Sequence, residues 1–97
     1  MTVYVDTLQD WGWVMYGRTI QSCHMFTEAI DQHELHMMAK NIGLKRNYFQ
    51  DHPDHPHYDL TASRRAAAIR MGAVCVTCRE MVRIVHERNE RMEAAHG

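Results

Sequence analysis

The sequence has few residues of several kinds, and its opposite charges nearly cancel. Its 97 residues include only two prolines and three cysteines. Eleven basic and twelve acidic residues give a formal charge of −1, which argues against strong binding to nucleic acid, because that affinity rests on positive charge. No apolar run reaches the roughly 18 residues of a membrane span, and residues 1–6 lack the basic start of a signal peptide. We therefore expect no membrane association and no exported leader.

The three cysteines, Cys23, Cys75 and Cys78, are an odd number without the spacing of a disulfide framework. Such usage is typical of reduced proteins of the cytoplasm, where we expect this chain to be found. Cys75 and Cys78 have C-x-x-C spacing, but there is no second pair of this kind. We interpret all three as reduced and Cys75 and Cys78 as structural core residues rather than as a redox or zinc site.

The composition fits one globular α/β domain. Hydrophobic residues make up 45% of the chain, and its length suits a single domain, which we assign to residues 1–97. β-Branched and aromatic residues predict strands at 2–5 and 18–26, a further strand that begins at Tyr48, and a strand at 73–77 that is buried on both faces. With the helices described next, the element order predicts a short, mostly parallel or mixed sheet packed by about three helices.

Helical spacing is clearest in the residues after Asp31. Either Thr27 or Asp31 can cap this helix, and Gly43 can end it. Its core-facing stripe follows the i, i+3, i+4, i+7 pattern and consists of Leu35, Met38, Ala39 and Ile42.

Two more helices follow later in the chain. One begins at Thr61 or Ser63 and ends before Gly72. The last begins near Arg79 and runs into a polar C-terminal tail, residues 90–97. We expect its inward-facing residues to be Met81, Val82, Val85 and Met92.

Histidine is abundant, with eight residues in the chain, and three of these lie in the segment 50–57. Two prolines in this segment interrupt either kind of regular structure, so we expect a His- and Pro-rich loop. A His-rich tract can collect metal ions. However, no rigid element is predicted to hold His52 and His55, and we expect no specific role for these two.

The strongest chemical feature is a set of histidines and aspartates at the ends or edges of predicted elements. Imidazole and carboxylate groups bind zinc or manganese, and the same groups carry general acid–base chemistry near neutral pH. His57 and Asp59 alternate along an extended segment and so share a side. We predict a shared site with His57, Asp59 and His36 as catalytic residues; its metal ligands would be Asp6, His24, His36, His57 and Asp59.

A structural interpretation of the same residues stays open. His24 can be a hydrogen-bonded core histidine, and His57-Tyr58-Asp59 can be a hydrogen-bonded corner. A corner would bury His57, whereas a ligand or acid–base group would be partly exposed. We expect the exposed arrangement, in which loss of His57 abolishes metal uptake and leaves the metal-free fold almost unchanged.

Trp11, Trp13 and Tyr16 form an aromatic segment near the N-terminus. These rings can stack on a nucleotide base, cover the core or anchor a partner protein, including a second copy of the chain. No glycine-rich phosphate loop accompanies them.

Several short pieces, in order, resemble a bacterial and phage family known only as domain of unknown function 4031. The pieces, which span roughly residues 1–85, are Val3-Tyr4-Val5-Asp6, Ser22-Cys23-His24-Met25, Glu34-Leu35-His36, His57-Tyr58-Asp59, and Arg65 through Gly72-Ala73-Val74 to Arg79-Glu80-Met81. Two features depart from the family pattern, namely Glu28 where the family tends to have Asp and a longer loop before His57. The resemblance implies no activity.

Three functions remain open. The first is a small histidine–aspartate site that binds a divalent metal, zinc or manganese, and a phosphate-containing ligand, in the manner of a phosphoester hydrolase. The second is a non-catalytic phage or bacterial protein that binds or inhibits a host protein, and an exposed pair of tryptophans would favour it. The third is a nucleotide-binding module without chemistry. The sequence does not decide whether the chain is an enzyme.

Overall fold

A computed structural model describes residues 2–96. The strands are β1 (Val3–Val5), β2 (Val14–Met15), β3 (Arg18–Thr19), β4 (Ser22–Thr27), β5 (Tyr58–Thr61) and β6 (Val74–Cys75). The helices are α1 (His33–Asn41), the short 3₁₀ helix η1 (Arg46–Tyr48), α2 (Ala62–Arg70) and α3 (Cys78–His96). Four strands form one sheet in the order β5-β4-β1-β6, in which β6 is parallel to β1 and the other neighbours are antiparallel. The predicted α/β class with a mixed sheet is therefore confirmed.

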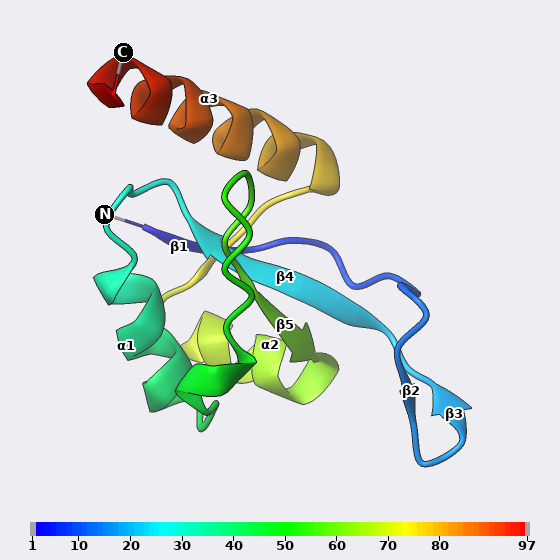
Figure 1. Cartoon of the computed structure of the whole chain (residues 1–97). Coiled ribbons are helices and arrows are strands. Elements are labelled where there is room, and N and C mark those ends of the chain that lie inside the picture. Colours follow the sequence, from blue (N-terminus) through cyan, green and yellow to red (C-terminus); the bar gives the residue numbers. More distant parts are fainter. Residues whose placement is uncertain (1, 97) are drawn as a thin grey trace.

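The sheet separates two helical layers. Helices α1 and α2 cover one face, and α3 crosses the other face, where the loop 51–56 rises to meet it (Figure 1). Side chains alternate along each strand, so residues of odd number on β1 and β4 point to the α1–α2 side. The core on that side includes Val5, Met25, Leu35, Tyr58 and Leu60, none of which is exposed to solvent. On the α3 side lie the even-numbered residues of β4 and, because His24 pairs with Asp59, the odd-numbered residues of β5.

The predicted strand 18–26 is wrong at its beginning. Arg18 and Thr19 pair with β2 in a separate hairpin, and the central strand β4 starts at Ser22. The hairpin turn is Tyr16-Gly17, and both residues have positive φ, 52° and 76°. Such a two-residue turn matches the twist of antiparallel strands, and glycine adopts it without strain. The aromatic segment is thus carried on a projecting hairpin (Figure 1).

The helix ends follow local sequence signals. Gly43, with φ of 86°, ends α1, because Leu44 N–H donates to the Ala39 carbonyl around it, as predicted. Asp31 accepts from His33 N–H just before α1, but Gln32 is the cap residue. The Thr61 hydroxyl caps α2 by accepting from Arg64 N–H.

The strand at 73–77 is not buried on both faces, as the sequence suggested. Strand β6 is a two-residue edge strand, so Val74 and Cys75 are exposed, and Cys78 is half-buried. The interpretation of Cys75 and Cys78 as core residues is therefore wrong. Cys23 on β4 is the buried cysteine, and its burial, with the charge of Asp6, raises its thiol pKa to about 12.

Three further expectations need correction. Residues 46–48 form a 3₁₀ helix rather than a strand start, because the Tyr48 and Phe49 N–H groups donate to the carbonyls three residues back. The segment 90–96 is the continuation of α3, not a tail; Gly97 lies outside the described residues. Met81 on α3 is buried as expected, whereas Val82 is exposed, because only one narrow face of α3 meets the sheet and the loop.

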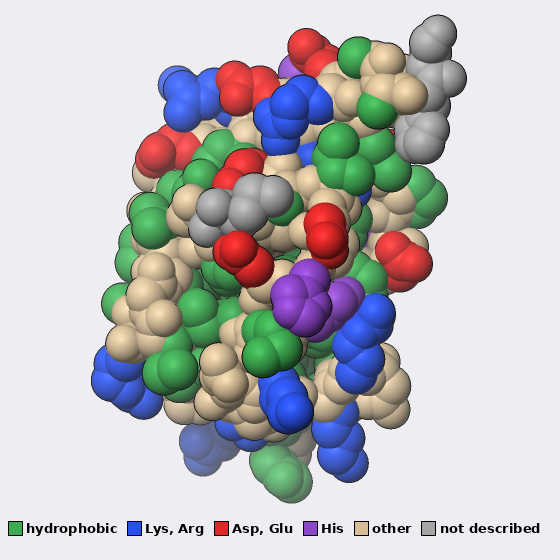
Figure 2. All heavy atoms as spheres, turned by 90° about the vertical axis from the view of Figure 1, so that its left-hand side faces the viewer, with side chains coloured by type: hydrophobic (Ala, Val, Ile, Leu, Met, Phe, Trp, Pro, Cys, Tyr) green, Lys and Arg blue, Asp and Glu red, His purple; other side chains and the backbone are tan. Residues whose placement is uncertain are grey.

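Charges of both signs are mixed on the face that contains α1. Basic side chains lie along its lower edge and again near the top, and acidic side chains and histidine lie between and beside them (Figure 2). Within residues 2–96, no helix combines the length and the apolar character that a membrane crossing needs.

Candidate functional site

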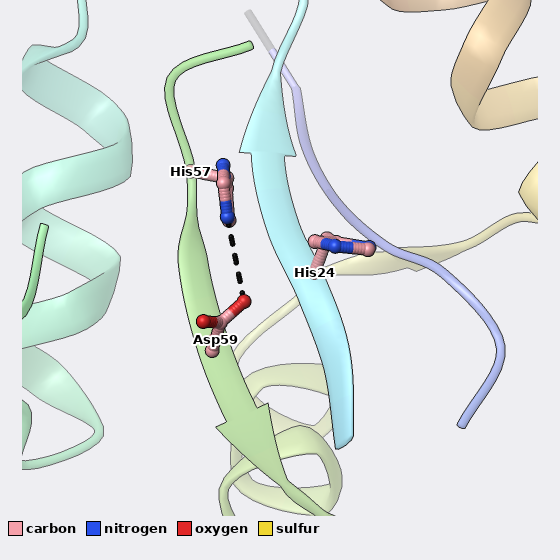
Figure 3. Close-up of side chains that lie close together, drawn as sticks. All are labelled: His24, His57 and Asp59. Atoms are coloured by element: carbon pink, nitrogen blue, oxygen red, sulfur yellow. Dashed lines mark ion pairs between the residues drawn. The ribbon is translucent and has the colours of Figure 1, made fainter. Parts of the chain in front are cut away.

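His24, His57 and Asp59 lie together on the α3 side of the sheet. Each offers one potential ligand atom, and these three atoms lie within 4.8 Å of one another. His24 projects from β4, while Asp59 and the residue just before β5, His57, lie along the neighbouring strand on the same side (Figure 3).

Strand pairing explains why these residues meet. His24 lies directly opposite Asp59 in the antiparallel β4–β5 register, so their side chains share one face. His57 precedes Asp59 by two positions, and an isolated bridge with Gln50 keeps that segment extended. Three residues from two sequence regions therefore reach one point of the sheet surface.

Asp6 stands behind His24. Its carboxylate, which is fully buried, accepts the His24 backbone N–H at 2.6 Å and pairs with the His24 ring Nδ1 at 2.8 Å. A carboxylate can only accept, so Nδ1 carries the proton and the lone pair of Nε2 is free. Metal-bound histidines are commonly oriented by a carboxylate in this way. Asp6, which the sequence suggested as a ligand, is bonded to His24 and lies outside the group of His24, His57 and Asp59.

His57 has an equivalent arrangement. Its Nδ1 donates to the His55 backbone carbonyl at 2.7 Å, which leaves Nε2 facing Asp59. The expectation that His57 is partly exposed is wrong, because the residue is only 7% exposed. Burial results from the neighbouring histidine rings, since the His24 and His55 ring centroids lie 5.0 and 4.5 Å from that of His57.

His57 and Asp59 form an ion pair with a separation of 3.4 Å between Nε2 and Oδ1. Burial disfavours the charged ring of His57, but the interaction with Asp59 and the His55 carbonyl outweighs it and raises the His57 pKa. The same interaction with His57, helped by the Gln50 amide, lowers the Asp59 pKa. The two groups therefore favour each other's charged form.

His36 is not part of this group. Its Nδ1 lies 2.9 Å from the Tyr58 hydroxyl, and its ring packs edge-on against Phe49. Tyr58 alternates with His57 and Asp59 along β5 and so points to the opposite face of the sheet. The expected convergence of His36 with the other three is therefore wrong, because α1 packs on the other side.

The positions of His36 and His24 on opposite faces of the sheet predict different effects of replacing them. We expect His36→Phe to leave any affinity for zinc or manganese unchanged, since the ring lies across the sheet from His24, His57 and Asp59. His24→Phe, the matched change within the group, should abolish binding. Isothermal titration calorimetry with both variants measures this, and a large loss of affinity in His36→Phe would contradict the placement.

The loop 51–56 is held more firmly than its sequence suggests. The Arg88 guanidinium on α3 donates to the Pro53 carbonyl at 3.4 Å, and the Asn89 amide donates to the Asp54 carbonyl at 2.8 Å. His55 is thereby packed against the site, with its ring centroid 5.2 Å from that of His24. Its buried Nε2 has no hydrogen-bond partner within the described residues. The packing of His55 against the site could not be predicted from the sequence, because the α3 residues that hold the loop follow His55 by more than thirty positions.

A hollow of about 290 Å³ opens onto the three residues. Trp11 and Trp13 form one wall, and His24, His57 and Asp59 form the floor. The Trp11 ring lies edge-on to the His24 ring, with centroids 5.1 Å apart. The side chain of Asp59 is 37% exposed and lies at the mouth, so small molecules can reach the group.

The donor set fits a divalent cation. Two imidazole nitrogens with free lone pairs and one carboxylate are the three protein ligands of many catalytic zinc sites, and of open manganese or iron sites. Ligand atoms bound at about 2.1 Å lie at most about 4.2 Å apart, so small rotations of the side chains suffice for coordination. Three ligands leave a position for water or substrate.

The comparisons with known proteins extend the sequence resemblance. No curated protein and no solved structure matches the chain. One family model, described as "Protein of unknown function (DUF4031)", matches residues 3–88. This range includes every residue of the site as well as Asp6 and Gln50, and with most of its length matched the chain belongs to the DUF4031 family.

Proposed function

We propose that this protein binds a divalent metal ion, zinc or manganese, through His24, His57 and Asp59, and hydrolyses a phosphomonoester. The observation that carries the proposal is the pair of preset histidines. Asp6 and the His55 carbonyl each hold an Nδ1 proton, so both Nε2 lone pairs are free on the side of Asp59. A purely structural corner would not need both rings in the same tautomer.

The chemistry follows from this donor set. A divalent ion with an open position polarises a phosphoryl oxygen and lowers the pKa of water to near 7. In this reaction the oxygen of water bonds to phosphorus and the ester P–O bond breaks. One proton of the water goes to the leaving alcohol, and the other stays with the inorganic phosphate. His24, His57 and Asp59 hold the ion, and Asp6 and Gln50 keep the histidine and the carboxylate in position.

The experiment measures metal content and hydrolysis together. Protein purified without a histidine tag should contain close to one equivalent of zinc or manganese after dialysis. It should release phosphate from 4-nitrophenyl phosphate, and chelation should abolish this activity and metal should restore it. Metal binding without hydrolysis would leave only the binding function, and the absence of both would overturn the proposal.

A protein-binding role is the alternative with a specific observation in its favour. Tyr16 at the tip of the hairpin is 97% exposed, and Val14 beside it is 60% exposed. Exposed aromatic side chains at a projecting tip are typical anchors of protein interfaces. If the metal tests fail, we expect the hairpin to be the surface that binds a host protein.

A further inference from the structure

A second hollow of about 490 Å³ adjoins the hollow over the histidines. The two share Trp13 and Asp59 as lining residues, so they lie next to each other. The volume of the second hollow lies within the range of sites for small organic ligands, which is about 300–1,000 Å³. A molecule held at Asp59 can therefore extend past Trp13 into a larger space.

The walls of the second hollow are mainly apolar. They include Trp13 and Met15 from the hairpin and Leu44 and Tyr48 from the segment after α1. Trp13 and Met15 are two positions apart and so lie on one side of the hairpin, which the hydrogen bond from Ile20 N–H to the Trp13 carbonyl (2.9 Å) holds in register. Both side chains are half-buried, which leaves part of the Trp13 ring open to the hollow.

The second hollow also contains a positively charged side chain that is held in place. The Arg64 guanidinium lines the second hollow and donates through one nitrogen to the Ile42 carbonyl at the end of α1. It lies against Gly43, where an added Cβ would be 2.6 Å from the same nitrogen. The absence of a side chain at position 43 thus gives Arg64 its place, and no contact in the described residues uses its second terminal nitrogen. A planar guanidinium held in this way can donate to acceptors at the edge of a nucleobase, as arginine does to O6 and N7 of guanine.

The combination of these features in two adjacent hollows matches one class of molecule. The metal-side hollow suits a phosphate, the apolar hollow suits an aromatic ring system, and Arg64 suits oxygen acceptors at the edge of that ring. We propose that the substrate is a nucleoside monophosphate, with its phosphate at His24, His57 and Asp59 and its base against Trp13 with an edge toward Arg64. This proposal rests on the function proposed above and names its substrate class.

The test compares ligands with and without a base on the zinc-loaded protein. Calorimetric titration with the four common ribonucleoside monophosphates, ribose 5-phosphate and inorganic phosphate should give the tightest binding for a nucleotide. Stacking on a tryptophan strengthens binding by about tenfold or more. We therefore expect the best nucleotide to bind at least tenfold more tightly than ribose 5-phosphate.

Variants locate the base. Trp13→Leu should remove the tenfold preference while the affinities for zinc and ribose 5-phosphate stay unchanged. Tyr16→Leu is the matched control, since Tyr16 is an aromatic residue of the same hairpin that lines neither hollow, and it should retain the preference. If Trp13→Leu loses zinc affinity through misfolding, Tyr48→Ala on the opposite wall, at a position 55% exposed, provides the second test.

The outcomes separate the two proposals. Equal affinities for nucleotides and ribose 5-phosphate, together with intact zinc binding and phosphatase activity, would overturn the nucleotide assignment and leave the proposed function standing. A preference that survives both Trp13→Leu and Tyr48→Ala would place the base elsewhere and also overturn it. Failure of the native protein to bind zinc or manganese would overturn both.

Discussion

Zinc or manganese should raise the midpoint of thermal unfolding of the native protein by about 10 °C or more and should leave that of Asp59→Asn unchanged. At a metal concentration of 100 times the dissociation constant, binding adds about 2.7 kcal/mol to the free energy of unfolding. For a domain of this size, each kcal/mol shifts the midpoint by about 4–8 °C. Asparagine keeps the shape of Asp59 and removes the charge that a cation needs.

Asp59 is a better position for this test than His57. His57 is buried and its Nδ1 is bonded, so His57→Ala would lower stability whether or not a metal binds. Asp59 has a side chain that is 37% exposed, so its replacement disturbs the metal-free fold less. Differential scanning fluorimetry with and without metal, after chelator treatment, measures both effects separately.

A matched control lies in the neighbouring loop. Asp54 is exposed and contacts the rest of the protein through its backbone carbonyl, so Asp54→Asn removes the same charge without removing a ligand. We expect Asp54→Asn to retain the full metal-induced shift. A shift of native size in Asp59→Asn would show that the three-residue group is not where the metal binds.

The sequence predicts part of this site well because one rule, the alternation of side chains along a strand, places His57 and Asp59 together. It also names His24 for the same site, but not the pairing that brings His24 there, since the register between β4 and β5 is set by contacts distant in the chain. It also misplaces His36. A helical wheel shows which side of α1 faces the core, but not which face of the sheet α1 covers.

Local sequence signals explain most of the fold, and the start of α3 carries one that the sequence analysis above does not use. Thr77 and Glu80 form a capping box at the start of α3, in which each side chain accepts the other residue's backbone N–H at 3.1 Å. Their T-x-x-E spacing is visible in the sequence, and these bonds lower the Glu80 pKa. The packing of His55 has no such signal, because it depends on contacts from Arg88 and Asn89 on α3 to the loop.

The packing of His55 predicts that acid destabilises the metal-free protein. Burial and the neighbouring His57 and His24 rings lower the His55 pKa from 6.5 to about 4. Between these pH values the unfolded chain takes up a proton at His55 that the folded protein does not, so stability falls as pH decreases from 6.5 toward 4. Each pKa unit corresponds to about 1.4 kcal/mol, but the ring is partly exposed and solvent screens it, so we expect a loss of about 1–2 kcal/mol.

Urea unfolding at pH 7 and pH 4.5, with chelator present, measures this loss. His57 acts in the opposite direction, since its raised pKa stabilises the fold at low pH and this contribution disappears as pH rises through the folded value. His55→Gln removes only the destabilising group, so this variant should lose about 1–2 kcal/mol less than the native protein between the two pH values. His33→Gln, at an exposed position on α1, should follow the native protein. An equal acid loss in His55→Gln and the native protein would mean that His55 is not held as a neutral ring against His24 and His57.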